Sequence, residues 1–159
     1  MSPMISNPRG DDRVVSGNAS DDAHWRRVLA HRSRDGQDTV DAAVERFRAA
    51  GVTPEEAESH LKDGGDRLYA AAHTGAGDWA DAFGGPRAVA VVAAEVSALM
   101  SHLVARAASV RAACVDALLD EFSAVAVANA LGVARQKVYE LAKPEVDPDY
   151  LMITPWRAE

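Results

Sequence analysis

The chain has 159 residues and a formal net charge of -7 at pH 7, and 48% of its residues are hydrophobic. This length and composition indicate one domain whose core is built from Ala, Val and Leu, because aromatic residues make up only 6%. Cys114 is the single cysteine and excludes an intramolecular disulfide, and the N-terminus lacks the basic start and apolar run of a signal peptide. We therefore expect a soluble cytoplasmic protein with no membrane association. The abundance of Ala and Arg is typical of proteins from GC-rich bacterial genomes.

Helical patterns begin after a polar N-terminal stretch. Residues 1–20 combine Ser, Asn, Pro, Gly and Asp with few large apolar side chains, so we expect a disordered tail there. Residues 21–85 form an N-terminal helical region in which apolar side chains recur at helical spacing. The clearest helix start in it is Thr53, which Glu56 follows three residues later in a capping-box arrangement.

The acidic side chains are concentrated in residues 38–85, which carry 10 acidic and 4 basic residues. This stretch favours a solvated helix surface, with a docking surface for a basic protein partner as the alternative. Glu56 and His60 lie one helical turn apart, but no second pair of ligands matches them, so we predict no metal site. The chain also lacks a nucleophile elbow and a phosphate-binding glycine loop. We predict no catalytic residues and no cofactor, and therefore a protein that is not an enzyme.

The longest helical pattern covers residues 86–121 and contains no internal Gly or Pro after Pro86. Its apolar residues alternate in steps of three and four, as the seam of a coiled coil does. The members of this seam are Val89, Val92, Val96, Leu99 and Leu103. The pattern predicts either the seam of a homodimer or a central helix that the N-terminal helices of the same chain surround.

A second pattern follows in residues 122–143, where two short helical stretches flank Gly132. A small residue, Ala128, precedes this glycine by four positions, and the glycine can adopt the positive φ of a tight turn. The expected core positions are Ala128, Leu131, Gly132, Val133, Val138 and Leu141. Residues 123–143 resemble the helix-turn-helix family of DNA-binding proteins.

This resemblance implies a recognition helix that begins at Ala134 and enters the major groove of double-stranded DNA. It implies that Arg135 and Gln136 read base edges, and that Lys137, Tyr139 and Lys143 contact phosphates. Family members commonly place Ser or Thr where this chain has Ala134, so this helix lacks its usual side-chain cap.

The first helix of the pair contains almost no polar residues. We therefore expect Val125 to be covered by the long helix, a second subunit or another protein. Residues 144–159 end the chain with an apolar cluster after an acidic, proline-interrupted linker, and we expect this tail to dock on the body or on a dimer mate.

Together these patterns predict an all-α protein with an N-terminal helical region, a long central helix and a C-terminal helix-turn-helix. The expected function is sequence-specific binding of double-stranded DNA, in transcriptional regulation by a homodimer. The alternative is a helical protein-protein interaction or assembly module, whose partner binds the acidic residues 38–85 or the face around Val125.

Overall fold

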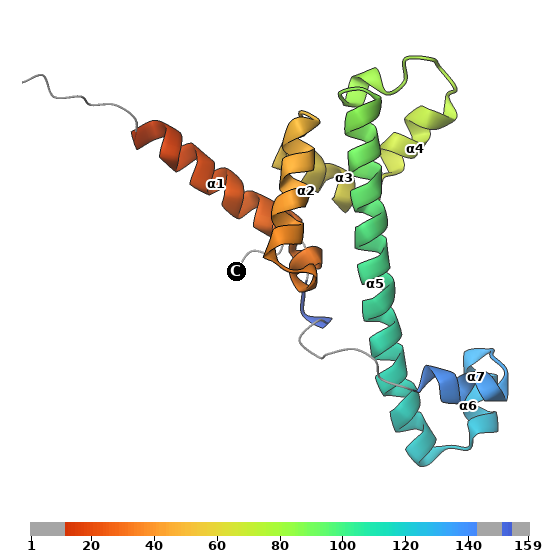
Figure 1. The fold of residues 1–159 in the computed structure, drawn as a ribbon. Helices are drawn as coiled ribbons and strands as arrows, with labels where there is room; N and C mark the ends of the chain where they lie inside the picture. The colour runs from red at the N-terminus through yellow and green to blue at the C-terminus, as the bar shows by residue number, and fades with distance from the viewer. Residues whose placement is uncertain (1–11, 143–150, 154–159) are drawn as a thin grey trace, which may run out of the picture.

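The computed structural model of the protein describes residues 12–142 and 151–153, and these residues form helices and no strands (Figure 1). The all-α prediction and the long central helix are thereby confirmed. The elements in chain order are α1 (Asp12–Val28), the 3-10 helix η1 (Ala30–Asp35), α2 (Gln37–Ala49), α3 (Pro54–Lys62), α4 (Asp66–His73), the 3-10 helix η2 (Asp81–Phe83), α5 (Pro86–Glu121), α6 (Ala124–Leu131) and α7 (Arg135–Leu141).

Helix α5 is the spine of the molecule. Its 36 residues correspond to a length of about 54 Å at 1.5 Å per residue. Figure 1 shows α2 and α3 beside its N-terminal half and α6 and α7 beside its C-terminal end. The N-terminal helices and the C-terminal pair therefore occupy different parts of one long helix.

The main core lies between the N-terminal half of α5 and helices α1 to α4. Trp25 of α1 stacks on Phe47 of α2 with ring centroids 4.9 Å apart, and both side chains are buried. These aromatic side chains fill the space between α1 and α2, where the small residues of the chain would leave a void.

The residues of the predicted seam belong to this core. Val92, Val96 and Leu99 are at most 4% exposed within one chain, and Val89 and Leu103 pack against the same cluster. Helices of the same chain cover this apolar stripe, which was the other arrangement that the pattern left open. A coiled-coil spacing identifies an apolar side of a helix without specifying whether the covering helix comes from the same chain.

The N-terminal boundary also differs from the expectation. Helix α1 begins at Asp12, inside the predicted disordered tail 1–20, and gives way to η1 after Val28. The buried turns around Trp25 anchor α1, and helix propagation from them costs little, so a polar sequence extends the helix. Residues 1–11 lie outside the described part of the chain.

The start of α3 has the helix cap that the sequence predicts. The Thr53 hydroxyl accepts a hydrogen bond from the Glu56 amide at 3.3 Å, and the Glu56 carboxylate accepts one from the Thr53 amide at 2.9 Å. This confirms the capping box. A glycine pair, Gly64 and Gly65, separates α3 from α4, and both have positive φ.

Among the described residues, α5 is the helix that is long and apolar enough to cross a membrane by length and composition. Its most apolar 18-residue window has a mean hydropathy of 1.8. The core helix of a soluble protein meets the same criteria, and α5 buries Val92, Val96 and Leu99 against its own chain. Hydropathy alone therefore does not place α5 in a bilayer.

Candidate nucleic-acid interface

Helices α6 and α7 and the turn between them form a compact unit on the end of α5, which we call the C-terminal helix pair. The Ser123 hydroxyl begins α6 by accepting a hydrogen bond from the Ala126 amide at 3.2 Å. Helix α7 begins after Ala134, which provides no side-chain hydrogen bond. The amide of Lys137 is bonded to the backbone oxygen of Ala134 at 2.9 Å instead.

The turn depends on the backbone conformation of Gly132. This residue ends α6 with φ +66°, in the left-handed region that L side chains rarely adopt. The Val133 amide then donates to the Ala128 oxygen at 3.1 Å and closes the turn. A Cβ added to Gly132 would have no atom within 4 Å, so the requirement for glycine is conformational and not steric.

Three helices contribute to the small core beneath the pair. Val127 and Ala128 of α6, Val138 of α7 and Val115 of α5 are buried together. The half-buried side chains of Leu118, Leu119, Val133, Leu141 and Ala142 surround them. The sequence had not assigned this role to the end of α5, whose Val115 and Leu119 form the third wall.

Leu131 departs from its predicted place in this core, because its side chain is 38% exposed. It lies in the last turn of α6 beside the exposed Gly132, at the edge of the three-helix contact. Helical spacing placed it on the same side as Val127 and Ala128, but the neighbouring helices bury only those two.

Helix α7 presents four of the predicted DNA-binding residues to solvent. Arg135, Gln136, Lys137 and Tyr139 are all exposed, while Val138 between them is fully buried. Lys137 forms an ion pair with Glu140 at 2.8 Å, and both side chains are about half exposed. Lys143, the fifth predicted residue, lies outside the described residues.

The charge around this exposed helix is mixed. Residues 112–142 carry two basic and four acidic side chains, a formal charge of -2. Asp116, Asp120 and Glu121 lie exposed near the C-terminal end of α5, and Glu140 lies on α7. Arg135, Lys137 and Glu140 give the C-terminal helix pair itself a formal charge of +1, and the three carboxylates of α5 lie next to it, so attraction to phosphate is confined to the surface of α7.

Apolar side chains are also exposed on the C-terminal helix pair and beside it. Phe122 is 52% and Val125 is 53% exposed, so the described residues do not provide the expected cover for Val125.

No model of a known protein family matches this chain. No curated protein and no solved structure matches it either. The interpretation of the C-terminal helix pair therefore depends on its own residues and geometry.

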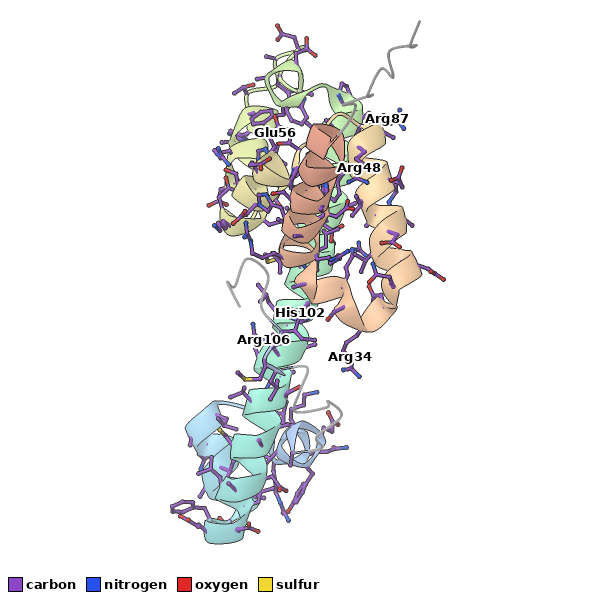
Figure 2. The ribbon with its side chains drawn as sticks, turned by 90° about the vertical axis from the view of Figure 1, so that its left-hand side faces the viewer. Arg34, Arg48, Glu56, Arg87, His102 and Arg106 are labelled. Carbon is purple, nitrogen blue, oxygen red and sulfur yellow. The ribbon has the colours of Figure 1, made fainter. Side chains whose placement is uncertain are left out.

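The described part of the C-terminal tail, residues 151–153, contacts the middle of α5. His102 Nε2 donates to the Ile153 oxygen at 2.9 Å, and Arg106 Nε donates to the Leu151 oxygen at 2.8 Å. Figure 2 shows His102 and Arg106 on the stretch of α5 between the two groups of helices. Burial lowers the pKa of His102, so its ring is neutral at pH 7. The tail thus docks on its own chain at these residues, away from Val125.

A buried ionic cluster lies next to this contact and had no signal in the sequence. The carboxylate of Glu95 on α5 accepts hydrogen bonds from His31 at 2.6 Å and from Arg32 at 2.7 Å. Burial alone would raise the pKa of Glu95, but these bonds hold it below its usual value. The cluster connects η1 to α5 across more than sixty positions of sequence, which local patterns cannot reveal.

Four of the ten acidic side chains in residues 38–85 form ion pairs with described residues, namely Glu45, Glu55, Glu58 and Asp63. Glu58 contacts Lys62 at 2.6 Å and His24 at 2.6 Å, and these bonds lower the pKa of Glu58 to about 2. Asp63 pairs with Arg67 at 2.6 Å. These carboxylates stabilise contacts of the N-terminal helices, which reduces the charge available to a basic partner.

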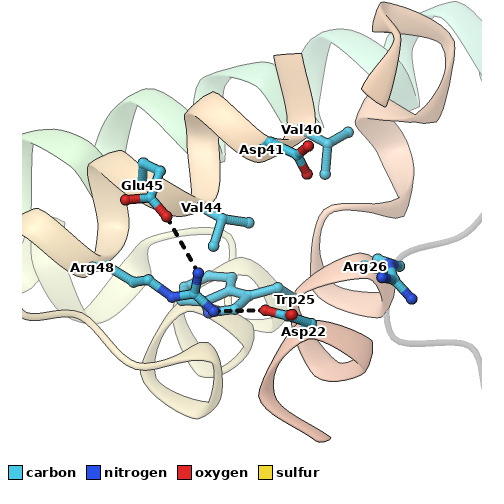
Figure 3. Close-up of a pocket in the computed structure, with 8 residues that line it drawn as sticks. All are labelled: Asp22, Trp25, Arg26, Val40, Asp41, Val44, Glu45 and Arg48. Atoms are coloured by element: carbon cyan, nitrogen blue, oxygen red, sulfur yellow. Dashed lines mark hydrogen bonds and ion pairs between the residues drawn. The ribbon is translucent and has the colours of Figure 1, made fainter. Parts of the chain in front are cut away.

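A cleft of about 310 Å³ lies between α1 and α2, with Trp25 and Val44 among its lining residues (Figure 3). Arg48 spans it, with ion pairs to Asp22 at 2.7 Å and to Glu45 at 3.3 Å. The bond from Arg48 to Asp21 at 2.8 Å, followed by the bonds to Asp22 and Glu45, raises the pKa of Arg48, so the guanidinium is fully charged and already engaged by carboxylates. The arrangement connects the two helices and gives no indication of a particular ligand.

Proposed function

We propose that the C-terminal helix pair is a helix-turn-helix that binds double-stranded DNA in a sequence-specific manner, and that the protein regulates transcription. The observation that carries this proposal is the two-sided character of α7. Val138 fixes the helix against α5 and α6, while Arg135, Gln136 and Lys137 project into solvent from its first turn. The first turn of a recognition helix is the part that approaches base edges in the major groove.

The exposed residue types suit this role. The guanidinium of Arg135 makes no hydrogen bond to the described residues and offers a bidentate fork to guanine. Gln136 can pair with adenine through its amide, and Lys137 and Tyr139 can reach phosphates. The positive φ of Gly132 supports the same reading, because it sets the close turn between the two helices.

The acidity of the surrounding unit limits nonspecific affinity. A unit with about three phosphate contacts loses roughly forty-fold in affinity between 50 and 200 mM salt. Repulsion from Asp120 and Glu121 further weakens binding to arbitrary duplexes, so base contacts must supply much of the affinity. We expect weak binding of a single unit and stronger binding where two units engage adjacent half-sites.

The test is binding of purified protein to a pool of random DNA duplexes, followed by titration of the enriched duplex at 50 and 200 mM salt. We expect enrichment of a defined sequence, and a loss of about 1 to 3 kcal/mol for Arg135→Ala. Arg87→Ala is the matched control, because it removes the same charge near the start of α5 and should bind as the wild type does. No enriched sequence, or equal binding by Arg135→Ala and the wild type, would overturn the proposal.

The exposed Phe122 and Val125 favour a second function, docking of another protein on α6. In that case, a partner chain would copurify with the protein and Val125→Asp would release it. The two functions separate cleanly, because Val125→Asp leaves the exposed residues of α7 in place while Arg135→Ala leaves the apolar surface intact.

A further inference from the structure

The C-terminal half of α5 has a second apolar side, distinct from the one buried in the main core. Ala107, Val110, Cys114 and Ala117 follow one another in steps of three and four residues, so they lie along one side of the helix. All four are exposed, and Val110 is 55% exposed. We call these four residues the free face of α5.

The C-terminal helix pair leaves the free face open. Val115, Leu118 and Leu119 are the positions of α5 that pack beneath the pair. At about 100° of rotation per residue, Val115 and Leu119 lie roughly 140° around the helix from the middle of the free face and Leu118 roughly 60° from it, so the pair borders the four exposed residues without covering them. The N-terminal helices reach along α5 as far as Leu103, which packs against the main core just before the free face begins.

We propose that a second copy of this chain covers the free face, with the two α5 helices antiparallel. The charges along this half of α5 support a copy as the occupant. Arg106 and Arg111 precede the middle of the free face, and Asp120 and Glu121 follow it. An antiparallel copy brings each basic end beside an acidic end, whereas a parallel copy would bring like charges together.

One axial register of the antiparallel pair brings opposite charges near each other and allows the two helices to pack closely. It sets Val110 beside the partner's Cys114 and Arg106 level with the partner's Leu118, about 3 Å along the axis from the partner's Asp120. The small side chains of the free face allow the helix axes to approach to about 8 Å. The partner's α5 then ends level with Leu103, where the N-terminal helices begin to cover α5, and it passes beside residues 151–153, which contact His102 and Arg106.

The expected affinity is modest. Two helices that pair over about fifteen residues bury less than the roughly 1,200 Å² of a standard interface. We therefore expect a dimer that forms in the micromolar range and dissociates on dilution.

The first experiment is sedimentation of the full chain, without DNA, from 1 to 100 μM. We expect a monomer-dimer equilibrium that Val110→Glu shifts at least tenfold toward monomer without lowering the melting temperature, because Val110 is exposed in the monomer. Ala94→Glu is the control, since Ala94 is an exposed residue of α5 far from the free face, and it should dimerise normally. A monomer throughout this range, or equal dimerisation of Val110→Glu and the wild type, would overturn the proposal.

A second experiment fixes the orientation. Val110→Cys places a thiol beside the partner's Cys114, so mild oxidation should give a covalent dimer. In the wild type, the two Cys114 residues are offset by about 6 Å along the axis and by the helix separation, which together exceed the roughly 7 Å Cα limit for a disulfide. Efficient oxidation of the wild type to a covalent dimer would show parallel helices and contradict the antiparallel arrangement. Because neither experiment contains DNA, failure of DNA binding would leave this inference standing.

Discussion

The two ends of α5 are stabilised in different ways. Its N-terminal half is buried by several helices, with a stacked aromatic pair and the buried carboxylate of Glu95. Its C-terminal end supports only α6 and α7 over a small core of Val and Ala side chains, with larger apolar side chains left exposed. The comparison indicates that the N-terminal half provides most of the stability, and that the C-terminal end presents surface for contacts with other molecules.

Removal of the Glu95 carboxylate tests whether the N-terminal half of α5 provides most of the stability. Of the substitutions considered, it should lower the free energy of unfolding most. Glu95→Ala leaves the buried His31 ring and the Arg32 guanidinium without their shared acceptor, so we expect a loss of about 3 to 5 kcal/mol in the free energy of unfolding. Urea denaturation measures this loss. Glu95→Gln keeps an oxygen acceptor and should lose less. A loss below about 1 kcal/mol for Glu95→Ala would show that the cluster contributes little.

The turn of the C-terminal helix pair should respond more weakly and more locally. Gly132→Ala forces a side chain into the left-handed region, at a cost of about 1 to 2 kcal/mol. Because the added Cβ meets no neighbour, the cost falls on the turn alone. We expect faster amide hydrogen exchange in α6 and α7 with unchanged exchange around Trp25. Equal acceleration in both regions would show that they unfold as one unit.

The smallest expected effect is an increase in the stability of the C-terminal helix pair. Ala134→Ser supplies the missing side-chain cap of α7 and should stabilise the C-terminal helix pair by about 1 kcal/mol. Slower hydrogen exchange at the amides of Gln136 and Lys137 would show this. Unchanged exchange there would mean that the backbone bond from Lys137 to Ala134 already satisfies the start of the helix.

The sequence predicted those features that depend on neighbouring residues. The capping box at Thr53 and the positive φ of Gly132 follow from local chemistry, and the length of α5 follows from the absence of internal Gly and Pro. Features that depend on distant contacts were missed or misassigned. The spacing of Val92, Val96 and Leu99 identified an apolar side without its covering helices.

The candidate site shows the same division. Exposure of the α7 side chains follows from helical periodicity around Val138, which the sequence located. The third wall from α5 and the exposure of Leu131 depend on how three helices meet, and no local pattern specifies that. The bond between His31 and Glu95 joins residues so far apart in the chain that only the folded structure identifies it.

The most direct test of DNA reading by α7 is discrimination at single base pairs. The enriched duplex is compared with versions that carry one substituted base pair each, for the wild type and for Arg135→Ala. We expect the wild type to lose about 1 to 3 kcal/mol at one guanine, and Arg135→Ala to bind the original and the substituted duplex equally well. Equal discrimination at every position by both proteins would contradict the assignment of Arg135 to base recognition.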